Sequence, residues 1–177
     1  MNPPDTMTQR LDEAYERYGA ACAEIQRSKT DWFHANGIIT SPIEIAMADA
    51  LLIMETGYGW EHEGHLDIVP SDFSSDSRLI VQIVPQKVVG PYRLDFAIRV
   101  RNAYGAYHFF AVECDGHDFH EKTKRQAAHD KRRDRYLQSS GYRVYRFTGS
   151  EIYADPKKCA DEIGAAVSNV IYPRSRP

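Results

Sequence analysis

Two acidic residues lie in adjacent apolar segments whose predicted pairing would bring them together. Asp95 belongs to the first segment, residues 92–100, and Glu113 lies near the end of the second, residues 107–116. Both segments have the composition of β-strands, and residues 102–105 between them have that of a turn. In an antiparallel pair the start of one strand lies beside the end of the next, so we expect Asp95 and Glu113 to meet.

Carboxylates crowded at the end of an apolar hairpin repel one another. Asp115 follows Glu113 by two positions and adds a third acid to the same end. A hard cation such as Mg²⁺ relieves this repulsion and prefers oxygen ligands. A metal ion held in this way can activate water against a phosphodiester. The acidic hairpin therefore predicts a hydrolytic metal site.

Composition sets broad bounds on the protein. The 177 residues are 42% hydrophobic and 27% charged, as expected for one globular domain with a substantial core. The sequence shows no apolar run of membrane-spanning length and no signal-peptide pattern at its start. Cys22, Cys114 and Cys159 are far apart and lack metal-ligand spacing, which favours reduced thiols in a cytoplasmic protein.

Charge is unevenly distributed, although the net charge is only -3. Residues 117–146 contain nine lysines and arginines against four acids, whereas residues 1–70 contain four against twelve. A basic face directly after the acidic hairpin would suit a groove that binds nucleic-acid phosphates. The alternative is a solvated helix whose charges pair with one another. The candidate phosphate contacts are Lys122, Lys124, Arg132 and Arg133.

Hydrophobic periodicity and turn residues predict the elements that would position these side chains. Helices are expected at residues 8–27, 41–55, 119–140 and 157–171, with a short helical turn at 31–34. Strands are expected at residues 79–84, 92–100, 107–116 and 142–147, with a long loop at 56–78. This alternation predicts an α/β protein.

Several short motifs follow one another in a distinctive order. They are Ser41-Pro42-Ile43-Glu44, Gln86, Tyr92-Arg93-Leu94-Asp95-Phe96 and Val112-Glu113-Cys114-Asp115-Gly116. Together they resemble the restriction-endonuclease-like nucleases of the PD-(D/E)XK superfamily. A second set is more narrowly similar to very-short-patch repair endonucleases and their small bacterial and phage relatives. That set is His120, Asp130-Lys131-Arg132-Arg133-Asp134, Leu137, Gly141 and Val144-Tyr145-Arg146-Phe147.

The resemblance covers residues 41–150 and implies a fold. That fold is a single domain with a central mixed β-sheet of about four strands flanked by helices, in the order αβββαβ. Residues 1–40 would form an N-terminal helical extension, residues 41–150 the nuclease core, and residues 151–177 a C-terminal helix and tail.

The resemblance also implies an activity, namely hydrolysis of phosphodiester bonds in DNA with Mg²⁺ or Mn²⁺. Asp95 and Glu113 would bind the metal directly, and the carbonyl of Cys114 would complete its protein ligands. Glu44 or Asp115 would add a ligand or act through water.

One position departs from the superfamily pattern and leaves the catalytic base open. The superfamily often has Lys where this chain has Asp115, and that Lys would orient the attacking water or offset developing charge. Aspartate does neither, and His120 is the candidate proton acceptor because imidazole titrates near neutral pH. One alternative is a nucleic-acid-binding module without turnover, and another is a structural or interaction subunit.

Glu44 and Gln86 also have structural interpretations. Ser41, Pro42 and Glu44 match a capping box, with Ser41 as N-cap, Pro42 at the first helical position and Glu44 reaching back. That role would account for Glu44 without any part in a site. Gln86, a candidate nucleic-acid contact, is similarly ambiguous.

Overall fold

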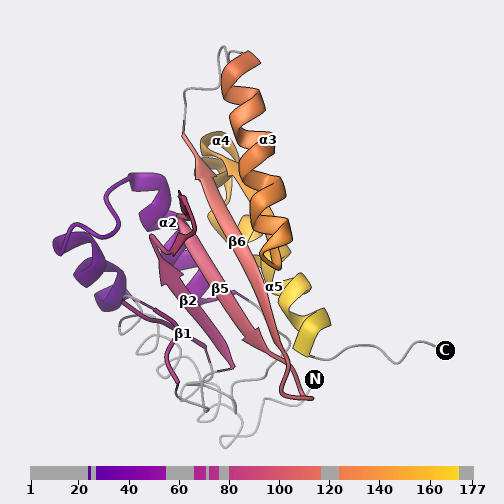
Figure 1. The fold of residues 1–177 in the computed structure, drawn as a ribbon. Helices are drawn as coiled ribbons and strands as arrows, with labels where there is room; N and C mark the ends of the chain where they lie inside the picture. The colour runs from indigo at the N-terminus through magenta and orange to yellow at the C-terminus, as the bar shows by residue number, and fades with distance from the viewer. Residues whose placement is uncertain are drawn as a thin grey trace, which may run out of the picture.

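A mixed β-sheet forms the centre of the fold in the computed structural model (Figure 1). Its strands are β1 (Leu66–Ile68), β2 (Val81–Pro85), β5 (Phe96–Arg101), β6 (Tyr107–Asp115) and β7 (Tyr142–Thr148). They lie in the order β1-β2-β5-β6-β7, with β2, β5 and β6 antiparallel and both edge strands parallel to their neighbours. The structure describes residues 24, 27–54, 66–70, 72–75, 80–116 and 124–171.

Helices cover both faces of this sheet. They are α2 (Pro42–Leu52), α3 (Lys124–Ser139), α4 (Gly149–Ala154) and α5 (Pro156–Ile171). Phe96 and Val112 belong to a buried cluster that includes residues of α2, α4 and α5. Because side chains alternate along a strand, Ala97 and Ala111 face the other side, where they pack in a smaller cluster with Leu137 of α3. The predicted α/β class and the mixed sheet flanked by helices are confirmed, with five strands rather than about four.

Several predicted elements match the structure closely. The helix expected at residues 41–55 is α2, with Ser41 as its N-cap and Pro42 in its first turn. The strand expected at residues 142–147 is β7, and the helix expected at 157–171 is α5.

Two predicted helices fall partly outside the described residues. Within those residues, the helix expected at 119–140 is α3. Most of the helix expected at residues 8–27 also lies outside them, but residues 27–35 are helical without a break. Residues 31–34 therefore lie inside the helical stretch 27–35 and do not form a separate helical turn.

The prediction of a single strand at residues 92–100 is wrong. The chain forms β4 (Tyr92–Arg93), bends at residues 94–95 and then enters β5. β4 pairs with β3 (Val88–Val89) in a separate two-stranded sheet. The bend lies against the turn after β2, where the backbone N–H of Gln86 donates to the carbonyl of Asp95 at 2.8 Å. Asp95 is thus held at the junction of the two sheets.

Besides β3, two short elements were not expected. β1 lies inside the segment predicted as a loop, residues 56–78, and is stabilised by parallel pairing with β2. α4 begins at a capping box in which Thr148 and Glu151 each bond the other's backbone N–H. Among the helices that the structure describes, none is long and apolar enough to cross a membrane.

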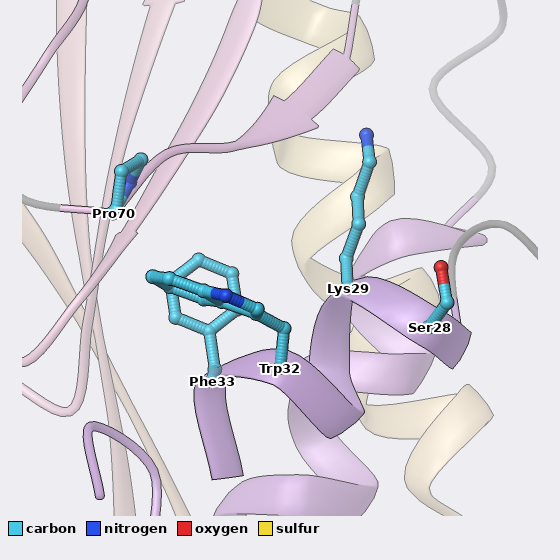
Figure 2. Close-up of a pocket in the computed structure, with 5 residues that line it drawn as sticks. All are labelled: Ser28, Lys29, Trp32, Phe33 and Pro70. Atoms are coloured by element: carbon cyan, nitrogen blue, oxygen red, sulfur yellow. The ribbon is translucent and has the colours of Figure 1, made fainter. Parts of the chain in front are cut away.

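A shallow pocket of about 250 Å³ lies at the β1 edge of the sheet (Figure 2). Its lining residues are Ser28, Lys29, Trp32, Phe33 and Pro70. None of the acidic or basic residues singled out in the sequence lines it. β1 is separated from β5 by β2, so this pocket is distinct from the acidic end of the hairpin.

Candidate active site at the end of the β5–β6 hairpin

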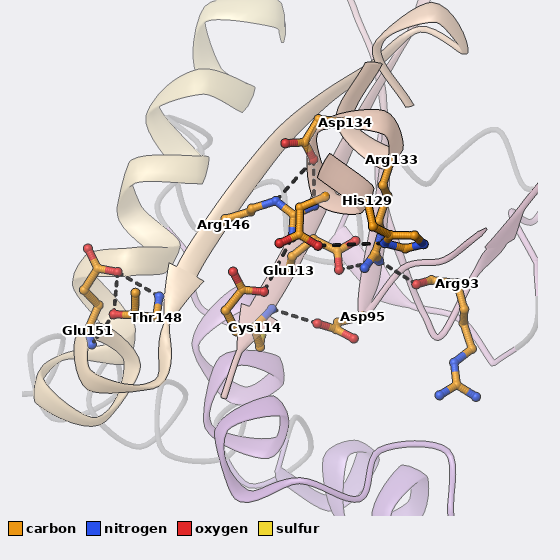
Figure 3. Close-up of polar contacts among 12 residues, drawn as sticks. Arg93, Asp95, Glu113, Cys114, His129, Arg133, Asp134, Arg146, Thr148 and Glu151 are labelled. Carbon is orange, nitrogen blue, oxygen red and sulfur yellow. Dashed lines mark hydrogen bonds and ion pairs between the residues drawn. The ribbon is translucent and has the colours of Figure 1, made fainter. Parts of the chain in front are cut away.

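Asp95 and Glu113 meet where the β5–β6 ladder ends. In this ladder Phe96 pairs with Val112, so the next position of the same register sets Asp95 opposite Glu113. The Asp95 carboxylate accepts a hydrogen bond from the backbone N–H of Cys114, with 2.7 Å between Oδ2 and N (Figure 3). The hairpin geometry expected for the two acids is therefore present, with a bend in place of a continuous strand.

Glu113 is an unusually buried acid. Its exposed fraction is 2%, and its Oε1 atom has no hydrogen-bond partner in the structure. Its Oε2 atom accepts from Nη2 of Arg133 at 2.5 Å. Burial, followed by the charge of Asp95, raises the pKa of Glu113 from 4.5 to about 8, although Arg133 acts in the opposite direction. A buried carboxylate oxygen without a partner is costly, so this residue has unused capacity to bind a cation.

Two arginines from other elements reach the acids (Figure 3). Arg133 of α3 also donates from Nη2 to the carbonyl of Arg93, at 2.7 Å. Arg146 of β7 is the ladder partner of Glu113. Arg146 donates to Asp134 at 2.6 Å. It also lies 3.5 Å from Asp115. These contacts fix α3 and β7 to the acidic end of β6.

Glu44 lies at the start of α2 and interacts electrostatically with Asp95. Burial is the main cause that raises the pKa of Asp95; the Cys114 hydrogen bond opposes it, and the charge of Glu44 raises it further. The predicted cap is confirmed in part, because Ser41 accepts from the N–H of Glu44 at 3.3 Å. However, the Glu44 carboxylate accepts from the N–H of Thr40, at 3.4 Å, one residue before the N-cap. Glu44 thus makes a capping contact and also acts electrostatically on Asp95.

The donor set at this position suits an oxygen-binding divalent ion. Asp95 and Glu113 supply carboxylate oxygens, and Cys114, the residue directly after Glu113, supplies a backbone carbonyl. Burial raises the pKa of the Cys114 thiol well above its ordinary value, so sulfur stays protonated and is a poor ligand. Among the described residues, no three His, Cys, Asp or Glu side chains are grouped as a metal site. The carboxylates of Asp95 and Glu113, the latter with an Oε1 atom that has no hydrogen-bond partner, fit a hard ion such as Mg²⁺, which takes oxygen ligands.

The residues predicted to contact nucleic acid differ in their exposure and in their partners. Gln86 lies in the turn after β2 with a φ of 53°, and its backbone supports Asp95. Arg132 is exposed on α3, as a phosphate contact requires. Arg133 instead points to Glu113, with 19% of its side chain exposed, so its guanidinium is paired with an acid of the site.

The remaining candidates are less well defined by the structure. Lys124 begins α3. His120 and Lys122 lie outside the described residues.

Arg146 and Asp134 were not among the predicted site residues. Both occur in the motifs that resemble very-short-patch repair endonucleases, but nothing in their spacing assigned them a contact. The sequence feature that could have identified this contact is Arg146 itself. An arginine inside a mostly apolar strand needs an acidic partner.

Comparison with known families adds a separate finding. A family model described as REase_MTES_1575, a restriction endonuclease-like family, matches residues 77–167, just over half of the chain. The chain belongs to this restriction endonuclease-like family. The matched segment includes Asp95, Glu113, Asp115 and both arginines of the site. No curated protein and no solved structure matched the chain.

Membership of this family supports the PD-(D/E)XK-like superfamily and indicates nuclease activity, with nucleic acid as the substrate. Restriction endonuclease-like proteins generally use divalent metals. These coarse properties agree with the oxygen donors at the end of the β5–β6 hairpin.

Proposed function

We propose that the protein is a divalent-metal-dependent endonuclease that hydrolyses phosphodiester bonds in DNA. The observation that carries this proposal is the pairing of Asp95 with the buried Glu113, one oxygen of which has no hydrogen-bond partner. Such an arrangement is costly unless a ligand compensates it, and groups with perturbed pKa values are typical of functional sites. The motifs shared with very-short-patch repair endonucleases favour that branch of the superfamily.

Each residue of the site has a proposed part in the reaction. Asp95, Glu113 and the carbonyl of Cys114 would hold Mg²⁺ or Mn²⁺. When bound, the ion would supply Lewis acidity toward the phosphate and lower the pKa of a water molecule. Glu44 and Asp115 would position that water through their carboxylates.

The other proposed roles concern protons and phosphates. His120 would accept the proton of the attacking water. Lys122, Lys124 and Arg132 would neutralise phosphates of the bound DNA, and the turn at Gln86 would lie beside the same strand.

A nucleic-acid-binding module without turnover is the second candidate, and two observations favour it. Glu113 is already paired with Arg133, and Asp115 occupies the position where the superfamily often has Lys. If metal does not displace the guanidinium, the site would bind DNA without cleaving it.

Two measurements test the proposal. The purified protein is incubated with plasmid, linear duplex and single-stranded DNA in Mg²⁺, in Mn²⁺ and in chelator; cleavage that requires the metal is expected.

Calorimetry with Mn²⁺ should show binding that Asp95→Ala and Glu113→Ala each abolish. Glu162→Ala, an exposed acid on α5, serves as the matched control and should bind as the wild type does. Unchanged binding in both site variants would remove the basis of the proposal, and binding without cleavage would select the second candidate.

A further inference from the structure

The guanidinium of Arg133 lies beside Glu113, where the proposed metal ion would also bind. Its Nη2 atom bridges the Glu113 carboxylate and the carbonyl of Arg93. Its Nε atom is buried and has no hydrogen-bond partner in the structure. The guanidinium is therefore held by one edge only, with donor capacity left over.

A divalent ion and this guanidinium would compete for the same carboxylate. Oε2 of Glu113 is the atom that Arg133 contacts, and the carboxylate faces Asp95 across the hairpin. Two cations placed on one carboxylate in a poorly solvated site repel strongly. An ion bound at Oε1, the oxygen of this carboxylate without a hydrogen-bond partner, would therefore repel the guanidinium at Oε2 and weaken its contact with Glu113.

The surroundings of Arg133 indicate where its side chain would go. α3 is fixed independently, because Asp134 binds Arg146 and Leu137 is buried against the sheet. The helix would therefore stay in place while the side chain turns. The neighbouring Arg132 is already exposed to solvent, on the basic surface proposed to meet DNA.

We propose that Arg133 is a metal-gated phosphate ligand: it is paired with Glu113 in the metal-free protein and binds a DNA phosphate only when metal occupies the site. This inference rests on the proposed function. A guanidinium suits this transfer, since its planar fork pairs with carboxylates and phosphates alike. Metal and DNA would then strengthen each other's binding through Arg133, in addition to any direct contact between them.

The test compares DNA affinity with and without metal. Fluorescence anisotropy with a labelled duplex carrying cleavage-resistant phosphorothioate linkages is measured in chelator and in Mg²⁺. Arg133→Gln should leave affinity within about twofold of the wild type in chelator and weaken it about tenfold in Mg²⁺, the cost of one charge-assisted contact. Arg132→Gln, the exposed neighbour, should weaken affinity by the same factor in both buffers.

A second measurement follows Arg133 in the wild-type protein. In the wild-type protein, the Nε–H resonance of Arg133 should shift on addition of Mg²⁺ alone and shift again on addition of DNA. Arg133→Lys provides the assignment, because it removes that resonance while keeping the charge.

The outcomes separate this inference from the proposed function. If Arg133→Gln weakens DNA binding equally in both buffers, or in neither, Arg133 is not gated by metal and the inference fails, while Mn²⁺ binding by calorimetry leaves the metal site intact. A resonance unmoved by Mg²⁺ leads to the same conclusion. If the wild type binds no Mn²⁺, both the metal site and the gating are refuted.

Discussion

Replacement of Glu113 by glutamine should change how the stability of the protein depends on pH. In the folded, metal-free protein the pKa of Glu113 is raised to about 8 by burial and by Asp95, against an ordinary value of 4.5. The folded protein therefore keeps the proton through a range of pH in which the unfolded chain releases it. Raising the pH through this range favours the unfolded state, so the carboxyl group destabilises the fold progressively. Glutamine has no proton to release and removes this effect.

The size of the change follows from the pKa difference. Each pKa unit corresponds to about 1.4 kcal/mol. Integrated between about pH 5 and pH 8, Glu113 should lower the free energy of unfolding of the wild type by roughly 3 kcal/mol relative to Glu113→Gln. The effect of Arg133 is already contained in this pKa, which Arg133 lowers, while the exchange of a carboxyl for an amide changes the absolute stability by an amount of its own. The prediction therefore concerns the slope and not the absolute stability.

Urea unfolding followed by circular dichroism, in chelator and at several pH values, measures this slope. Glu151→Gln is the control, because the pKa of Glu151 is shifted in the opposite direction: hydrogen bonds from Thr148 lower it. The stability that Glu151 contributes is lost only as the pH falls below its ordinary range, so this variant should run parallel to the wild type between pH 5 and 8. If the difference between wild type and Glu113→Gln stays constant over that range, the account of a strained, proton-holding Glu113 is refuted.

Three further predictions concern the helix α3 and its surroundings. Leu137→Ala should lower the free energy of unfolding by about 2–5 kcal/mol in chemical denaturation, because Leu137 is fully buried against Ala97 and Ala111; a loss below about 1 kcal/mol would contradict the packing. Joint replacement of Lys122, Lys124 and Arg132 should weaken DNA binding at every sequence and flatten the dependence of log affinity on log salt by roughly 2–3, whereas an unchanged slope would place the groove elsewhere. His120→Ala should lower turnover by roughly 10²–10⁴-fold with Mn²⁺ binding unchanged; near-normal turnover would return the role of base to Asp115 or to water.

Local patterns were sufficient to predict much of the fold. The Ser41-Pro42 start of α2 is encoded within four residues, and β6 is a long run of β-forming side chains. The meeting of Asp95 and Glu113 follows from hairpin geometry alone, because antiparallel pairing places the start of one strand beside the end of the next.

Features that depend on contacts between distant segments were not predictable in this way. β1 is three residues long and is defined by its pairing with β2, more than ten residues later. The break between β4 and β5 depends on the turn at Gln86, whose positive φ is unusual for a residue other than glycine. In both cases the deciding interaction is absent from the local sequence.

The residues of the site also divide into those that the local sequence predicts and those that depend on contacts between distant segments. The acids were found because their chemistry conflicts with their apolar neighbours, and this conflict is visible in the sequence. Arg133 was interpreted as part of a basic surface, since a run of lysines and arginines does not reveal which side of the helix faces the sheet. Only the packing of α3 shows that Arg132 is exposed while Arg133 reaches Glu113.

The hydrogen bond from Cys114 to Asp95 makes one backbone amide a natural spectroscopic reporter of the site. Its N–H donates to a carboxylate oxygen at 2.7 Å, and such charge-assisted bonds strongly deshield the amide proton. Any cation that draws electron density from the Asp95 carboxylate must weaken that bond and move the resonance upfield. Occupancy of the site can therefore be followed in solution through a single backbone signal, without substrate, turnover or an introduced label.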